Sequence, residues 1–114
     1  MDLHTFRATV ERAPETLEFN DVIGLIDALY DFTPTAFRNG ETMNEAGQNN
    51  GSCRLFAFAK LQGLSEAQTL HCFGAYYREH VLPHPEGTDH QNIRNFMQTG
   101  WAGIAFAGEP LRAK

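Results

Sequence analysis

The chain has few basic residues and no long apolar run, and each shortage excludes a class of protein. Nine Lys and Arg stand against fourteen Asp and Glu, which gives a net charge of −5. The basic residues form no cluster, whereas binding to a phosphate backbone requires a concentrated basic face. No window approaches the roughly 18 uninterrupted apolar residues of a membrane span. We therefore expect neither nucleic acid nor a membrane as a partner.

Cysteine is also scarce, since Cys53 and Cys72 are the only two in the chain. Two cysteines are too few for the disulfide framework of a small secreted domain. The sequence also opens without the charged leader, apolar core and cleavage site of a signal peptide. These features predict reduced thiols and a cytoplasmic protein.

The apolar content is sufficient for one hydrophobic core. The 114 residues are 42% hydrophobic and 20% charged, which is close to ordinary globular usage. A chain of this length buries about two-thirds of the surface that its unfolded form exposes. We expect a single domain over residues 1–114.

Apolar residues recur at three- and four-residue spacing through much of the chain, which is the period of an α-helix. Pro14, Pro34 and Pro83 mark helix ends, because proline disfavours helical geometry in the residue before it. Gly63 is a predicted left-handed C-cap, and Ser65 begins a capping box. The expected helices are Leu3 to Ala13, Asn20 or Asp21 to about Phe32, Ser52 to Gln62, Ser65 to Leu82, and Thr88 or Asp89 to about Gly100.

The predicted fold is therefore an all-α bundle of about five short helices, with the apolar segment after Ser52 as its central helix. The tail "WAGIAFAGEPL" is apolar and spaced by glycines, which favours an extended strand. Such a tail is expected to pair with part of the 35–44 loop as a minor two-stranded feature. The polar stretch from Thr35 to Gly51 is long for a small domain, and loops of that length usually carry function.

Four stretches together resemble one known family. They are "YDFTPTAFRNG" at 30–40, "NEAGQNNGSC" at 44–53, "CFGAYYREHVL" at 72–82 and "DHQNIRNFMQTGW" at 89–101. Over essentially the whole chain, the sequence is similar to the HopJ type III effector family. The resemblance implies a small single-domain protein that type III secretion delivers into a host cell. It implies no reaction and no catalytic residues.

Polar side chains concentrate in the 39–52 loop and at the start of the last helix. Amides and one arginine that converge there would suit a small polar or carboxylated ligand, or a segment of a protein partner. The alternative is that the amides satisfy backbone groups of the loop itself. The candidate ligand-binding residues are Asn44, Gln48, Asn49, Asn50, His90, Asn92, Arg94 and Asn95. We favour a non-enzymatic binding module that needs no cofactor.

Cys53 raises a second hypothesis, a small cysteine-dependent hydrolase or transferase. "GSC" at a helix start has suitable physics, because a helix N-terminus stabilises a thiolate. His90 would act as the base, and Gln48 would donate to an oxyanion. The arrangement resembles papain-like proteases, but His90 follows too soon for their second lobe. The competing interpretation places Cys53 in the core as a small apolar residue.

The histidines raise a third hypothesis, a metal site formed by His80, His84, Asp89 and His90. His80 and His84 have the spacing of two ligands on one helix face. Pro83 and Pro85 interrupt that helix, so the two imidazoles need not share a face. Histidines near a helix C-terminus are also favoured by the helix dipole. The sequence therefore predicts no metal site.

Overall fold

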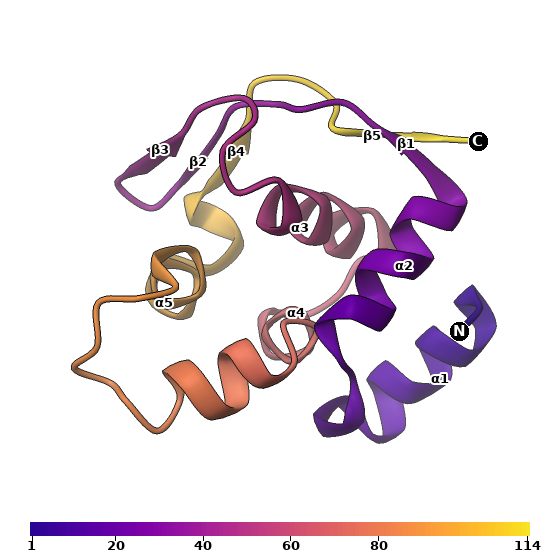
Figure 1. Ribbon diagram of the computed structural model, residues 1–114, viewed down its shortest axis with the longest axis horizontal. Helices are drawn as coiled ribbons and strands as arrows, with labels where there is room; N and C mark the ends of the chain where they lie inside the picture. The colour runs from indigo at the N-terminus through magenta and orange to yellow at the C-terminus, as the bar shows by residue number, and fades with distance from the viewer.

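The computed structural model describes all 114 residues and contains five α-helices, one π-helix, two short 3-10 helices and five short strands (Figure 1). The elements are α1 (Leu3–Arg12), η1 (Pro14–Thr16), α2 (Phe19–Leu29), β1 (Tyr30–Phe32), β2 (Phe37–Asn39), β3 (Thr42–Asn44), α3 (Asn50–Gln62), α4 (Glu66–His71), η2 (the π-helix, Tyr76–Val81), α5 (Gln91–Thr99), η3 (Gly100–Gly103), β4 (Ile104–Phe106) and β5 (Leu111–Ala113). None of the helices is long and apolar enough to cross a membrane.

The middle of the molecule is occupied by α3, with α2 on one side, α5 on the other, the strands above and α4 below (Figure 1). The middle of this helix, from Cys53 to Ala59, is buried except for Arg54, because this part is apolar nearly all round. Phe56 lies at its centre, and its ring contacts the rings of Phe37, Phe73, Phe96 and Trp101. The aromatic core therefore joins the strands to α5 and to the chain that follows α4.

The strands form two small antiparallel sheets. In the three-stranded sheet, β2 lies between β3 and β4, with Phe37 opposite both Asn44 and Phe106. The expected pairing of the 35–44 loop with the tail is therefore confirmed. In the second sheet, β1 pairs with β5. The all-α prediction was too narrow, since the fold is mainly α with a sheet component.

The second helix is shorter than predicted. It ends at Leu29, and Tyr30–Phe32 is strand β1 instead of a last helical turn. Thr33 N donates to Pro110 O at 2.8 Å and extends the pairing with the tail. Strands of three residues are too short to show an alternating pattern, so their pairing depends on a partner far along the chain.

The predicted helix from Ser65 to Leu82 is broken in two. Its capping box is confirmed, because Ser65 and Gln68 exchange side-chain-to-backbone hydrogen bonds at 2.9 and 3.1 Å. However, α4 ends at His71, and Gly74 adopts a left-handed φ of 62°. A Cβ there would lie 2.8 Å from Phe19 N, so the close approach of α2 requires glycine. The chain resumes as the π-helix η2, an element frequently found at functional sites.

Candidate functional site

The 39–52 loop and the start of α5 meet in space through a buried cluster of asparagines. Asn39 Nδ2 donates to Asn92 O at 2.8 Å and to Asn92 Oδ1 at 3.0 Å. Asn44 Nδ2 donates to Asn92 Oδ1 at 3.2 Å, and Asn92 Nδ2 donates back to Asn44 Oδ1 at 3.0 Å. Asn39, Asn44 and Asn92 are all buried. We call these three residues the asparagine cluster.

The neighbouring amides are also used inside the protein. Asn49 Nδ2 donates to Asn44 Oδ1 at 2.7 Å, and Asn95 Nδ2 donates to Asn39 O at 3.0 Å. Gln48 Oε1 accepts from Glu45 N at 3.1 Å within the preceding turn, while Asn50 is the first residue of α3. The contacts of Gln48, Asn49 and Asn95 favour the alternative that the amides satisfy groups of the loop and the helix. Asn50 differs, because its Oδ1 is buried without a hydrogen-bond partner.

Arg94 is likewise engaged by its own chain. Its Nε donates to Asp89 O at 2.7 Å, Nη1 donates to His84 O at 2.6 Å, and Nη2 pairs with Asp89 Oδ1 at 2.6 Å. Only 10% of its side chain is exposed. The hydrogen bond from Arg94 holds the pKa of the Asp89 carboxyl below its usual value. The geometry thus gives Arg94 a structural role, fastening the 84–89 segment to α5.

Cys53 faces the core and not a site. Its side chain is fully buried, and Sγ lies 3.6 Å from Thr35 O. Burial raises the pKa of the Cys53 thiol, and it raises the pKa of Cys72 to about 12. His90 contacts His80, Tyr76 and Asp89 instead of the thiol. The fold therefore gives the cysteine-dependent alternative neither an accessible nucleophile nor a base beside it.

Thiol labelling of the native protein is a direct check on this reading. Because raised pKa values keep both thiols protonated at neutral pH, the native chain should react with a thiol reagent no faster than it unfolds. Cys53→Ser should label at the same slow rate through Cys72. A fast reaction that depends on pH and disappears in Cys53→Ser would restore the cysteine-dependent hypothesis.

A groove of about 320 Å³ does open to solvent where α2, α3, η2 and α5 approach one another. Its lining residues are Phe19, Asn49, Gly51, Ser52, Phe73, Tyr76, His90, Gln91, Asn92 and Ile93. We call it the histidine groove. It adjoins a second depression of about 400 Å³, with which it shares Phe19, Phe73 and Tyr76.

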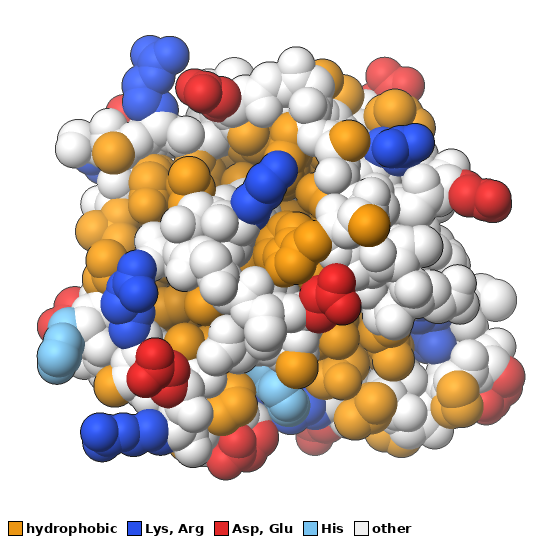
Figure 2. Space-filling model, turned by 180° about the vertical axis from the view of Figure 1, so that it is seen from behind, with side chains coloured by type: hydrophobic (Ala, Val, Ile, Leu, Met, Phe, Trp, Pro, Cys, Tyr) orange, Lys and Arg blue, Asp and Glu red, His pale blue; other side chains and the backbone are white.

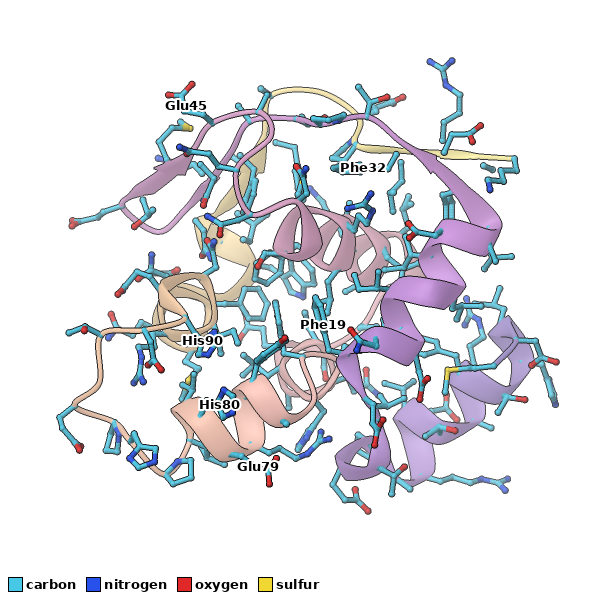
Figure 3. All side chains as sticks on the ribbon, viewed as in Figure 1. Phe19, Phe32, Glu45, Glu79, His80 and His90 are labelled. Carbon is cyan, nitrogen blue, oxygen red and sulfur yellow. The ribbon has the colours of Figure 1, made fainter.

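Aromatic and imidazole rings form one side of the histidine groove. The Tyr76 ring, in a residue that is 40% exposed, lies 5.3 Å from the Phe19 ring and 5.1 Å from the His90 ring. His80 follows on η2, and its Nδ1 is 3.3 Å from His90 Nε2. Figure 3 shows the His80 and His90 imidazoles side by side between η2 and α5, with Phe19 at the start of α2.

Two helix N-termini form the other side. Asn49 precedes α3 and His90 precedes α5, with left-handed φ values of 53° and 49°, and they are the only non-glycine residues with positive φ. Neither residue caps its helix with a side-chain hydrogen bond. The first N–H groups of a helix have no partner inside the helix and form the positive end of its dipole. No Asp, Glu, Lys or Arg lines the histidine groove, so these ends determine its electrostatic preference.

The face that is turned away from the viewer in Figure 1 carries Lys, Arg, Asp and Glu side chains interspersed among apolar ones (Figure 2). No basic cluster forms on that face, in keeping with the charge pattern of the sequence.

Sequence reasoning identified part of the groove and missed the rest. Asn49, His90 and Asn92 were among the candidates, but Phe19, Tyr76 and Gly51 were not. Phe19 and Tyr76 carry no local signal, because only the tertiary fold brings α2 beside η2. Gly51 carried a weak signal, since a glycine in the first turn of a buried helix often marks a close approach.

Comparisons with known proteins identify the family of the chain. The chain matches a family model described as HopJ type III effector protein over residues 3–111. Among solved structures, it is similar to a crystal structure of a protein of unknown function, VPA0580, with 54% sequence identity and a TM-score of 0.97. That alignment covers 100% of this chain and 95% of the other. No curated protein matches the sequence. The chain therefore belongs to the HopJ family.

Proposed function

We propose that this HopJ protein is a non-enzymatic binding module that holds a small planar anionic ligand in the histidine groove. The observation that supports it is the combination of exposed ring faces and unpaired helix N-termini in one groove. The arginine and most of the predicted amides make internal contacts, including Asn49 and Asn92 of the groove itself, so the proposal depends on the rings and the helix N-termini of the groove.

One side of the histidine groove favours a planar ring, and the other side favours an anionic group of the same ligand. A planar ring packs well against Phe19 and Tyr76, because aromatic pairs gain energy beyond their buried area. A carboxylate or phosphate is favoured at the starts of α3 and α5, where free N–H groups and the helix dipoles attract negative charge. At about 320 Å³, the groove lies at the small end of ligand sites, which are concave and few per protein.

A binding role fits the surroundings of the groove better than the cysteine-dependent alternative does. Ser52 is the only serine, threonine or cysteine that lines it. His90 faces the imidazole of His80 and the ring of Tyr76, so no hydroxyl or thiol nucleophile is hydrogen-bonded to it. Nucleophilic catalysis requires a base within hydrogen-bond reach of the nucleophile.

The description of the family adds a proposal about where the protein acts. As a HopJ effector, this chain would be delivered into a host cell by type III secretion. A translocation reporter fused to its C-terminus, compared between strains with an intact and a disabled secretion apparatus, tests this role. Equal signals in the two strains would count against delivery by that route.

Ligand binding can be tested with simple probes, namely benzoate, phenyl phosphate and the uncharged benzyl alcohol. We expect the two anions to shift groove resonances in an NMR titration and benzyl alcohol to do so far less. Tyr76→Ala should weaken anion binding by about 1 kcal/mol, or roughly fivefold to tenfold, without lowering Tm. Met97→Ala is a matched control, since Met97 is 43% exposed and lies outside the histidine groove.

A steric plug gives a second test. A Cβ on Gly51 would lie 3.0 Å from Phe19 Cζ, so Gly51→Ala narrows the groove between α3 and α2. We expect this variant to lose most probe binding while it stays folded. Gly24→Ala serves as the control, because its Cβ would meet nothing within 4 Å. Probe binding that survives in both Gly51→Ala and Tyr76→Ala would reject the histidine groove as the site.

A further inference from the structure

We propose that His80 and His90 form a two-imidazole site for a transition-metal ion of the Zn²⁺, Cu²⁺ or Ni²⁺ type at the rim of the histidine groove. The two residues come from η2 and from the cap of α5, and their facing nitrogens are His80 Nδ1 and His90 Nε2. Imidazole is a preferred ligand of all three ions.

The separation of the two nitrogens suits chelation. At 3.3 Å it is longer than the usual 2.7–3.2 Å range of protein N–H···O hydrogen bonds. Zn²⁺ bonds to imidazole nitrogen at about 2.0–2.1 Å, which at the tetrahedral angle places two such nitrogens about 3.3–3.4 Å apart. Both imidazoles can therefore ligate one ion without rearrangement of the backbone.

Side chains around His80 and His90 also favour a metal ion between the two imidazoles. The Tyr76 ring lies 5.6 Å from the His80 ring and 5.1 Å from the His90 ring, so it fixes both imidazoles from one side. Asp89 Oδ2 lies 3.9 Å from His90 Nε2, while its other oxygen is held by Arg94. A carboxylate at that place can accept a hydrogen bond from a metal-bound water, as outer-shell groups of metal sites commonly do.

The site is open. No group of three His, Cys, Asp or Glu side chains is assembled to hold a metal ion, so the protein supplies two ligands. The remaining positions of the ion are left to water or to the anionic group of a ligand in the histidine groove, which would join the metal to the proposed function. His84 takes no part, since no third His, Cys, Asp or Glu side chain joins the pair.

Metal titration of the full chain, purified without a histidine tag, tests the inference. Calorimetry with Zn²⁺ should show one site in the wild type and in His84→Asn. His80→Asn and His90→Asn should each bind at least roughly tenfold more weakly, about 1.4 kcal/mol. Asparagine is chosen because it tolerates the left-handed backbone of His90.

A spectroscopic measurement separates this site from scattered surface binding. With one equivalent of Cu²⁺, the electron paramagnetic resonance spectrum should report two nitrogen ligands in the wild type and fewer in either single variant. Equal binding by the wild type and both variants, or no binding by the wild type, would overturn the proposal. Because no organic ligand is present, this outcome is independent of the groove probes.

Discussion

Replacing Arg94 by alanine is expected to lower the free energy of unfolding by about 3 kcal/mol, because three hydrogen bonds from a buried guanidinium are lost. Two of its acceptors are the carbonyls of His84 and Asp89, and the third is the Asp89 carboxylate. Without the arginine, the segment from His84 to Asp89 loses its attachment to α5. For a domain of this size, the change corresponds to roughly 10 °C or more in Tm.

Thermal and urea unfolding measure this effect, and Arg54→Ala provides a matched control. Arg54 also pairs with an aspartate, at 3.1 Å from Asp27, but its side chain is 25% exposed and that of Asp27 is 51% exposed. A pair of this kind contributes about 0–1 kcal/mol. If Arg94→Ala were no more destabilising than Arg54→Ala, the guanidinium would be free to bind a ligand, as the sequence had led us to expect.

Replacing Asn92 by alanine should destabilise the protein by a similar amount, about 3 kcal/mol, for a different reason. The change leaves the side-chain amides of Asn39 and Asn44 without the Asn92 Oδ1 acceptor, and Asn44 Oδ1 without its donor from Asn92. Each of these groups keeps one other partner, so the cost is that of three lost hydrogen bonds, each worth roughly 0.5–1.5 kcal/mol. The asparagine cluster joins the β2–β3 hairpin to α5, so its loss also weakens the wall behind the histidine groove.

A double-mutant cycle isolates the contribution of the cluster. Asn44→Ala and Asn92→Ala should be coupled by about 1–3 kcal/mol in the free energy of unfolding, because each removes the partner of the other. Asn20→Ala is a suitable control, since Asn20 is exposed on α2. Additive effects of Asn44→Ala and Asn92→Ala would mean that the paired amides do not stabilise one another.

These two substitutions probe structure, whereas the groove variants probe binding, and the contrast follows from the fold. Arg94 and Asn92 have the composition of a ligand site but are buried among backbone and side-chain partners. Tyr76 and His90 form the exposed surface that remains. Burial and hydrogen-bond use therefore distinguish the supporting residues from the candidate binding residues.

Local features of the fold were predictable from the sequence. The capping box at Ser65 and the left-handed cap at Gly63 each involve residues within one helical turn. A few adjacent residues are therefore enough to predict each of them. The burial of Cys53 followed from the apolar residues around it on a helical period. The sequence left open whether the 39–52 loop meets the start of α5, and it offered internal use of their amides only as an alternative to ligand binding.

Features that depend on distant contacts could not be read locally. The strand at Tyr30–Phe32 forms because β5 lies beside it, and residues of that type also suit a helix. The break after His71 depends on Gly74, whose left-handed backbone is needed only because α2 passes close to it.

The histidines show most clearly which features the sequence can predict and which depend on the tertiary structure. Prolines between and after His80 and His84 argued correctly that these two need not share a helix face, and no spacing rule connects His80 with His90. The sequence by itself indicated most of the helices, through short-range periodicity and caps, and the family, through the four stretches that resemble it. Only the tertiary structure decided that Arg94 and the asparagines are buried supports and that His80, His90, Tyr76 and Phe19 meet. Packing between distant helices determines which polar groups find internal partners and which remain open to a ligand.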